Sequence, residues 1–594
     1  MWNSPFKDET SLSPRTIFAL AGIVCRHEFC FLGRKGRVVW DRWPSLVLAA
    51  AVALGGCTQR SESQVVNDST TGAPVSGETL NESNAALETA SPPELPVENQ
   101  AASSEHVVSP AKSDEAVAIE PAEITTTEIS STPGEKSFAE WPAPKFALFI
   151  TGRQHGYIEP CGCTGLANQK GGLARRHSAL EKVREKGWPT VALDAGNQVR
   201  RFGRQPEIKF QTTINGLRQM KYDVIAFGPD DLRLSSDEIL AAIVADETNV
   251  PFASTNVDVV GYLPTFRVLN AAGHKVGVTT VLGDSHHERV TSDELISVTP
   301  AADALRNVST ELEAASCDLY VLMAHASLEE SRELARAFPQ FDVVVTAGGA
   351  GEPTYQPEAI EGSDAVLIQV GTKGMYAGVV GVYDDAEQPL RYQRVALDAQ
   401  WPDSAEMIRL LAGYQQQLEA LRLDGLELRP VAHPSGRQFV GSEKCGECHT
   451  TAHAIWAGTP HSHATQTLVK PPERYEVPRH FDPECLSCHV TGWNAQGYYP
   501  YTSGYLEFEA SRHLHGNGCE NCHGPGSEHV AAEEGEIEAN DDQLKQLREQ
   551  MKLEYDDAKE HCLQCHDIDN SPDFHIEENF EKKYWPEIKH LGKD

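Results

Sequence analysis

The sequence is poor in positive charge for its length. Its 594 residues include 51 Lys and Arg against 86 Asp and Glu, which gives a net charge of −35. This deficit argues against nucleic acid or an anionic membrane surface as a binding partner. The apolar run near the N-terminus, Leu46–Leu54, is too short to cross a bilayer as a helix. A chain of this length predicts two or three folded units.

Residues 1–57 predict a signal peptide. Its start is uncertain, because residues 1–33 match neither the basic region nor the apolar region of a signal peptide. The apolar run is preceded by basic residues at Arg34, Lys35, Arg37 and Arg42. It ends in Leu54-Gly55-Gly56-Cys57, which resembles a bacterial lipobox in which Cys57 is lipidated. An ordinary signal peptide with a chance cysteine is the alternative. We expect an exported protein, lipid-anchored on the periplasmic or outer face of a bacterial membrane.

Residues 58–142 predict a disordered tether. They are rich in Ser, Thr, Glu, Ala and Pro and contain few aromatic residues. Such a composition cannot bury a core. After a lipidated cysteine, its simplest role is a flexible spacer from the membrane.

Residues 143–400 predict a layered α/β domain. Short apolar runs alternate with helical patterns, as is typical of strands that pack against helices. The predicted strands are 145–150, 190–193, 224–227, 319–323 and 343–345, and the predicted helices are 172–186 and 327–338.

Landmarks in residues 145–385 resemble the metal-binding domain of 5′-nucleotidase-like metallophosphoesterases. The matching phrases are Thr151-Gly152-Arg153-Gln154-His155-Gly156, Gly171-Gly172-Leu173-Ala174-Arg175-Arg176, Leu193-Asp194-Ala195-Gly196-Asn197, Gly228-Pro229-Asp230, Ala324-His325, Asp342 to Gly351, and Gln369-Val370-Gly371-Thr372-Lys373-Gly374. The resemblance implies the family's fold and positions for two metal ions.

Most of the metal ligands implied by this resemblance are replaced. His155 and His325 remain, whereas the other positions hold Arg153, Asn197, Gly228-Pro229-Asp230 and Gly348–Ala350. Two-metal hydrolysis needs both ions to hold the phosphoryl oxygens and to generate hydroxide. We therefore expect a retained scaffold with a degenerate metal site.

Two cysteines follow the first predicted strand as a C-x-C pair, in Glu159-Pro160-Cys161-Gly162-Cys163. With His155 nearby, the pair is compatible with a soft metal such as copper or zinc. It is equally compatible with a redox-active or disulfide pair, or with two ordinary thiols.

Residues 401–435 predict a helical connector. Apolar residues recur at helical spacing in Ser404–Leu421, and Pro430, Pro434 and Gly436 then interrupt the chain. A domain boundary near residue 435 follows.

The pattern C-x-x-C-H occurs four times in residues 436–594. It is the attachment pattern of c-type haem, in which two thiols bind the porphyrin and the adjacent His binds the iron. Zinc ribbons or disulfides are the alternatives, but neither requires a His after every second Cys. We predict four covalently attached c-type haems. The thiols are Cys445, Cys448, Cys485, Cys488, Cys519, Cys522, Cys562 and Cys565, and the proximal ligands are His449, His489, His523 and His566.

Local phrases in this segment resemble the tetrahaem cytochrome c-554 family, of the cytochrome c-552/4 type. They are Phe439-Val440-Gly441-Ser442, Trp456 with His461, Thr491-Gly492-Trp493, and Gly524-Pro525-Gly526-Ser527-Glu528-His529. The resemblance implies His461 and His529 as distal iron ligands. His590 is the next candidate, with His575 as its rival.

The haem segment is short for a domain that is predicted to hold four haems. About 150 residues around four haems leave little room for a protein-only core. We expect a mostly helical or irregular domain, unfolded without haem, with one charged helix over residues 531–560.

The leading functional hypothesis is a membrane-tethered, extracytoplasmic cytochrome that carries electrons between periplasmic donor and acceptor proteins. One alternative is a haem reductase of small nitrogen or sulfur compounds, which needs an iron without a distal His. Another is a phosphoesterase with an appended cytochrome. A further hypothesis treats residues 143–400 as a module that docks a redox partner.

Overall fold

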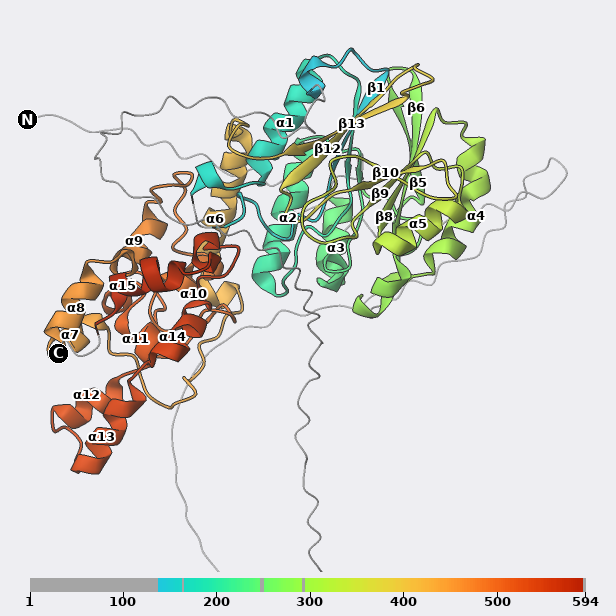
Figure 1. Ribbon diagram of the computed structural model, residues 1–594. Helices are drawn as coiled ribbons and strands as arrows, with labels where there is room; N and C mark the ends of the chain where they lie inside the picture. The colour runs from blue at the N-terminus through green and yellow to red at the C-terminus, as the bar shows by residue number, and fades with distance from the viewer. Residues whose placement is uncertain (1–136, 163–164, 246–249, 291–293, 591–594) are drawn as a thin grey trace, which may run out of the picture. The chain divides into compact units, whose positions relative to one another are not determined.

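The computed structural model describes residues 137–162, 165–245, 250–290 and 294–590 (Figure 1). The predicted signal peptide, Cys57, Cys163 and nearly all of the predicted tether lie outside this part of the chain. The described residues fall within one unit, Ala118–Asp594. None of their helices combines the length and apolarity needed to cross a membrane.

A five-stranded sheet has β1 at its centre. Its order is β13-β12-β1-β2-β3, with β1 parallel to β2 and antiparallel to β12. All six residues of β1 are buried, as expected for a strand covered on both faces. The strands are β1 Phe146–Thr151, β2 Thr190–Asp194, β3 Val224–Ile225, β12 Tyr376–Val382 and β13 Leu390–Ala396.

A six-stranded sheet has the order β10-β11-β9-β8-β6-β5. Strands β6, β8, β9 and β11 run parallel to their neighbours in this series, and β5 and β10 are antiparallel edges. The strands are β5 Phe266–Ala271, β6 His274–Leu282, β8 Leu319–His325, β9 Val343–Thr346, β10 Glu358–Ala359 and β11 Val366–Gln369.

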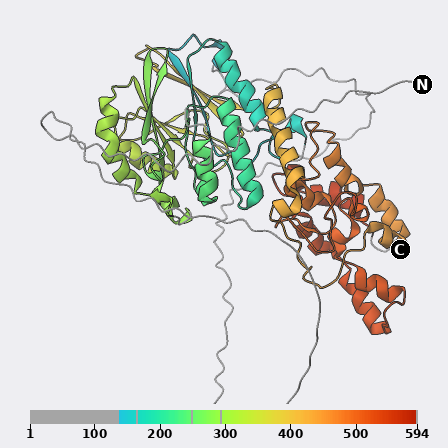
Figure 2. The ribbon, with the colours of Figure 1, turned by 180° about the vertical axis from the view of Figure 1, so that it is seen from behind.

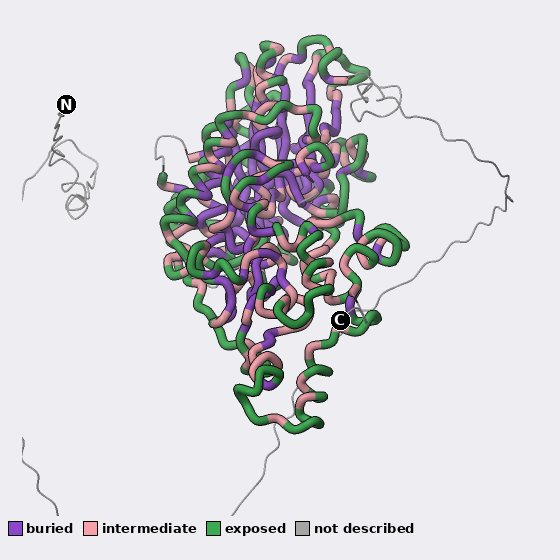
Figure 3. Tube along the Cα trace, turned by 90° about the vertical axis from the view of Figure 1, so that its left-hand side faces the viewer, coloured by how far each residue is buried: buried purple, intermediate pink, exposed green. Residues whose placement is uncertain are grey.

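The two sheets pack face to face between outer helices. Alternate residues of β1, such as Phe146 and Leu148, meet Val278 and Val321 of the second sheet in one apolar core. The intervening Phe149 faces α1 Leu173–Glu185 and α2 Arg204–Gln219 on the outside. Helices α4 Ala301–Ala314 and α5 Leu328–Ala337 cover the second sheet. The predicted layered α/β class is confirmed, and Figures 2 and 3 show the outer helices and the buried strands.

Smaller elements complete this region. Strands β4 Val257–Val259 and β7 Ile296–Val298 form an antiparallel pair, and α3 Ser236–Val244 packs through Ile239 and Ile243. The predicted connector contains α6 Ala405–Gly425, which begins at the N-cap Ser404. Its buried residues Met407, Leu411, Tyr414 and Leu418 join the core formed by α1 and α2.

The C-terminal segment is built from short helices around a small apolar core (Figure 1, orange and red). That core includes Phe439, Trp493, Tyr501 and Tyr505. The only strands described there are β14 Trp493–Asn494 and β15 Tyr499–Pro500. The helices are α7 Ser442–Gly446, α8 Thr450–Ala457, α9 Ala464–Val469, α10 Pro483–His489, α11 Cys519–His523, α12 Ser527–Glu533, α13 Asp541–Gln550, α14 Tyr555–Cys562 and α15 Trp585–Ile588.

The prediction of one charged helix over residues 531–560 is wrong. Three helices, α12, α13 and α14, occupy this stretch. Gly535 follows α12 with a φ of 74°, a left-handed conformation that glycine adopts without steric cost. Asn540 then starts α13 with a capping box shared with Gln543. These local end signals outweigh the helical spacing of the apolar residues.

A buried ion pair joins α1 to the end of β2. Arg176 Nη1 lies 3.0 Å from Asp194 Oδ2, and both side chains are 0% exposed. Asp194 also accepts hydrogen bonds from Thr151 Oγ1 at 2.7 Å and from Gln198 Nε2 at 2.6 Å. The pair therefore fixes the loop after β2 to the helix that follows β1.

The substitution Arg176→Met is expected to lower the free energy of unfolding by about 3–5 kcal/mol, because it leaves the Asp194 carboxylate buried without its partner. Denaturant unfolding followed by circular dichroism measures the change. Arg306→Met is the control, since Arg306 and Asp303 are each 63% exposed. Loss of this exposed ion pair should lower the free energy of unfolding by less than about 1 kcal/mol. Equal effects of the two substitutions would contradict the assignment.

Candidate functional sites

The four C-x-x-C-H motifs lie on or beside short helices. The second lies at the C-terminal end of α10, the third forms α11, and the first and fourth begin within the last residues of α7 and α14. One helical turn separates two cysteines three residues apart, so both thiols project to one side. All eight thiols are free of disulfides. Within the described ranges, no group of three or more His, Cys, Asp or Glu is placed to hold a metal ion.

Three of the four motif histidines face a second imidazole ring. Ring centroids are 6.3 Å apart for His449 and His529, 6.0 Å for His566 and His461, and 5.7 Å for His523 and His590. A metal–imidazole bond is about 2 Å long, so two rings that bind one iron from opposite sides have centroids about 6 Å apart. The structure thus brings each predicted distal histidine to a different motif.

Hydrogen bonds at Nδ1 orient the motif histidines. His523 Nδ1 lies 2.7 Å from Met551 O, His566 Nδ1 lies 2.9 Å from Ser571 Oγ, and His489 Nδ1 lies 2.9 Å from Ala464 O. An acceptor at Nδ1 leaves Nε2 available for a metal and raises the basicity of the ligand. The residues present therefore fit haem iron with imidazole ligands.

The second motif differs from the other three. No imidazole among the described residues makes a ring contact with His489, whereas His449, His523 and His566 each have one. Five other histidines of the segment have contacts elsewhere, whereas no such contact is described for His463 and His513. His453 packs on Trp456, His480 on Phe481, and the Nε2 atoms of His515, His561 and His575 contact Phe508 O, Asn521 O and His566 O.

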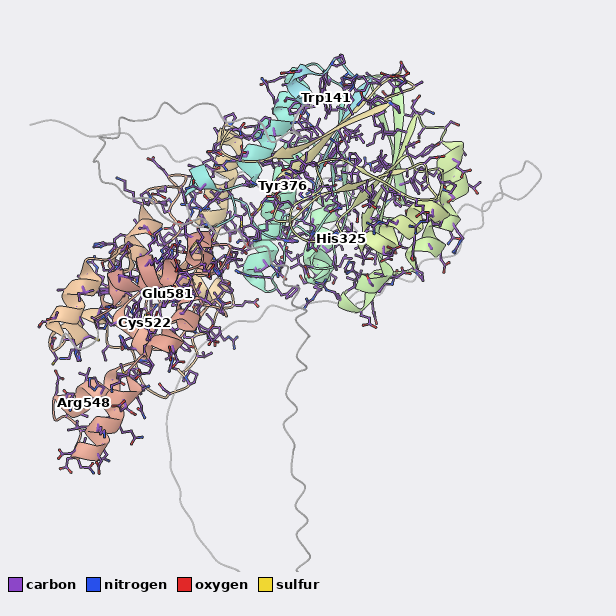
Figure 4. All side chains as sticks on the ribbon, viewed as in Figure 1. Trp141, His325, Tyr376, Cys522, Arg548 and Glu581 are labelled. Atoms are coloured by element: carbon purple, nitrogen blue, oxygen red, sulfur yellow. The ribbon has the colours of Figure 1, made fainter. Side chains whose placement is uncertain are left out.

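The cysteines show which motifs are neighbours. The Cys445 thiol interacts with the Cys519 thiol, which joins the first motif to the third. Cys488 interacts with Cys565, which joins the second to the fourth. Cys522, labelled in Figure 4, is close enough to Cys562 for their charges to interact. The order in space is therefore first, third, fourth, second.

Protein side chains bind one another at the expected metal-ligand positions of the α/β region. Arg153 Nη1 donates to Gly349 O at 3.0 Å, so a guanidinium reaches the loop that replaces the last ligand region. Asn197 Nδ2 donates to Asp230 Oδ2 at 2.9 Å, and Arg289 pairs with Asp230 at 2.5 Å. The one carboxylate left in the replaced triplet is thus already neutralised.

His325 (Figure 4) is buried at the end of β8. Its Nδ1 lies 2.8 Å from Ala195 O, and burial, together with the cationic Arg153 and Arg289, lowers its pKa to about 3. The ring of His286 packs against it at 5.8 Å. Sequence reasoning missed His286, because a histidine pair in a polar segment carries no signal of a long-range ring contact.

The loop after β1 contacts the chain just after the fourth motif. Tyr157 Oη donates to Asp569 Oδ2 at 3.1 Å, and Lys373 also pairs with Asp569. The buried Cys161 thiol interacts with Tyr157 and Lys373, and desolvation raises its pKa. Because Cys163 is not among the described residues, the role of the C-x-C pair stays a prediction.

Side chains of the α/β region form hydrogen bonds and ion pairs with the first turn of α10. Gln205 Nε2 donates to Asp482 Oδ1 at 2.7 Å, and Gln415 Nε2 donates to Asp482 Oδ2 at 3.0 Å. Lys209 Nζ lies 2.5 Å from Glu484 Oε2, and Arg201 Nη1 lies 3.1 Å from Glu484 Oε1. Asp482 is the N-cap of α10 and accepts from Glu484 N.

A second set of ion pairs joins the same surfaces. Arg479 Nε donates to Glu159 Oε2 at 2.8 Å, and Arg474 Nη2 donates to Pro160 O at 3.1 Å. The sequence held no signal for these contacts beyond the charged residues themselves, because their partners lie about 300 residues apart in the chain.

The chain thus has a phosphoesterase-like α/β region, in which most of the expected metal-ligand positions hold other residues, followed by a segment with four c-type haem attachment motifs. Residues 444–524 match the family described as cytochrome c554 and c-prime. The cytochrome c-554 of Nitrosomonas europaea is 34% identical over 98 residues, which are 15% of this chain and 39% of that protein. The C-terminal segment is therefore similar to c-type cytochromes, a class with covalently bound haem.

The preceding region is similar to 5′-nucleotidases. The snake venom 5′-nucleotidase of Crotalus adamanteus is 23% identical over 254 residues, 38% of this chain and 42% of that protein. The solved 5′-nucleotidase precursor of Thermus thermophilus is 20% identical, with a TM-score of 0.41, and covers 46% of this chain and 59% of its own. Both predicted resemblances are confirmed, and the chain spans less than half the length of these two curated relatives.

The substitution His590→Ala is expected to convert one iron from low-spin to high-spin, because it removes the imidazole that faces His523. The electron-spin spectrum of the exported, haem-loaded protein should lose one low-spin signal. His575→Ala is the matched control and should leave the spectrum unchanged. Loss of that signal in the His575 variant instead would exclude His590 as the ligand.

Acid is expected to destabilise the α/β region through His325. Its folded pKa of about 3 lies below the unfolded value of about 6.5, so stability is lost as the pH falls below about 6.5. Between pH 7 and pH 5 this single group accounts for a loss of about 2 kcal/mol. Urea unfolding at both pH values should show a smaller difference for His325→Gln, and an unchanged difference for the half-exposed His274→Gln.

Proposed function

We propose that the protein carries four haems and transfers electrons between periplasmic donor and acceptor proteins. The observation that carries this proposal is the set of three facing imidazole pairs, one for each of three motifs. Imidazole on both sides of the iron suits outer-sphere electron transfer, in which no bond to a substrate is made. When bound, the haems supply the redox chemistry, and the chain supplies ligands, spacing and burial.

The proposed path follows the contacts between cysteines. The first and third motifs form one pair, and the second and fourth form another, with Cys522 and Cys562 between the pairs. Electrons that enter at the first motif thus reach the second motif last. The net charge of −35 favours redox partners with basic docking surfaces.

A second candidate function is reduction of a small nitrogen or sulfur compound at the second motif. It is favoured by the absence of a ring contact to His489 in the described part of the chain, where His461 interacts electrostatically with His489 but has its ring contact with His566. An iron with one protein ligand can bind a small molecule at its other face. Because this motif ends the proposed path, three low-spin centres would supply it with electrons.

We also propose export and a lipid anchor at Cys57. The basic cluster, the short apolar run and the small residues before Cys57 support this location. The Ser/Thr/Glu/Pro-rich residues 58–142 would then separate the membrane from the folded part of the chain. Covalent haem attachment, which takes place outside the cytoplasm, agrees with export.

The electron-spin spectrum of the oxidised protein is expected to contain low-spin and high-spin signals in a ratio of about three to one. A reductive titration should consume about four electrons per chain. Cyanide should shift the high-spin signal alone. Four low-spin signals would contradict an open second site and leave the electron carrier as the sole function of the two, whereas fewer than four electrons would contradict the haem count.

A further inference from the structure

One buried carboxylate joins the third motif to the chain on both sides of the first motif. Glu520 lies between the two cysteines of the third motif and is 2% exposed. Its Oε2 accepts from Gly441 N at 2.7 Å, and its Oε1 accepts from Gly526 N at 2.8 Å. Val440 N donates to both oxygens, at 2.9 and 3.0 Å. The carboxylate therefore binds three backbone N–H groups.

Two of these N–H groups belong to the N-caps of helices that carry parts of the first haem site. Gly441 is the N-cap of α7, which contains Cys445. Gly526 is the N-cap of α12, which contains His529, and the ring of His529 faces His449. A side chain of the third motif thus fixes both the attachment helix and the helix of the predicted distal ligand at the first motif.

The carboxylate of Glu520 has backbone donors in place of a cationic partner. No Lys or Arg forms an ion pair with it in the described ranges, whereas Glu484, next to Cys485 of the second motif, pairs with Lys209 and Arg201. Burial raises the pKa of Glu520, and the backbone hydrogen bonds oppose this rise, because they favour the ionised form. The third motif therefore contains a buried negative charge that no neighbouring cation offsets.

This charge lies close to attachment atoms of two motifs. It interacts electrostatically with the thiol of Cys445 in the first motif and with the thiol of Cys519 in the third. These two thiols also interact with each other. In surroundings of low dielectric constant, a negative charge stabilises the more positive, oxidised state of a nearby redox centre. One carboxylate is thus placed to act on two centres.

We propose that Glu520 lowers the reduction potentials of the first and third haems together and holds these two sites as one rigid pair. Glu520 is a positioning residue that also supplies a fixed charge. Without it, both centres would accept electrons more readily, while the second and fourth would be unaffected. This inference rests on the haem attachment at the first and third motifs that the proposed function requires.

The test separates the charge of Glu520 from its reach. Glu520→Gln removes the charge and keeps the length of the side chain, whereas Glu520→Asp keeps the charge and shortens the side chain. The exported, haem-loaded proteins are titrated with a reductant at pH 8, and each low-spin electron-spin signal is followed against potential. The signals that disappear in His529→Ala and in His590→Ala identify the first and third haems.

Glu520→Gln should raise two midpoint potentials, those of the first and third haems. Each should be reduced about tenfold more readily, which corresponds to about 59 mV for one electron. Glu520→Asp should keep both potentials near their original values but lower the free energy of unfolding, because buried N–H groups lose their acceptor. The matched control is Glu447→Gln, since Glu447 lies between the cysteines of the first motif but is 60% exposed and pairs with Lys444. Solvent screens its charge, so no potential should shift by more than about twofold in equilibrium constant.

The failures of the two proposals differ. If the first and third motifs hold no haem, the proposed function fails and this inference fails with it. If all four haems are present and Glu520→Gln shifts no potential, the inference alone is wrong. Raised potentials in Glu520→Asp would also overturn it, even where the Gln variant does not assemble, because the charge is then retained without its predicted effect.

Discussion

The position of the second motif depends on the hydrogen bonds and the ion pair that the first turn of α10 forms with the α/β region. The donors are Gln205, Lys209 and Gln415. Two carboxylates at the start of a short helix would repel each other if buried alone, and here each is held by donors from the α/β region. The same helix carries both thiols and the histidine of the second motif. A haem site in the last quarter of the chain is thus positioned by side chains some 280 residues earlier.

The positions where the resemblance places metal ligands are held by contacts between protein side chains. In a two-metal site, the loops at the ends of the parallel strands must stay open to substrate. Here Arg153 and Asn197 close hydrogen bonds across those loops, and Arg289 neutralises Asp230. The positive side chains Lys209 and Arg201 suit the acidic first turn of α10.

The alternation of strands and helices could be predicted from the sequence, and so could the choice of the three histidines that lie opposite motif histidines, because each has a local signal. The C-x-x-C-H pattern indicates haem attachment by itself, and the histidines near each motif limit the candidates for the second iron ligand. The end of α12 at Gly535 and the start of α13 at Asn540 also have local signals. The helical spacing of the apolar residues nevertheless favoured one continuous helix. The hydrogen bonds to α10 and the contact of His286 with His325 could not be predicted, since they join residues that only the tertiary fold brings together.

The loop before Cys163 carries a consequence for how the molecule is made. A Cβ at Gly162 would lie 2.0 Å from Asp569 O, so the loop sits directly on the chain that follows Cys562 and Cys565. During synthesis the α/β region is completed first, so its surface is in place before Asp569 packs against it. A side chain at residue 162 would collide with the Asp569 backbone and keep the two surfaces apart.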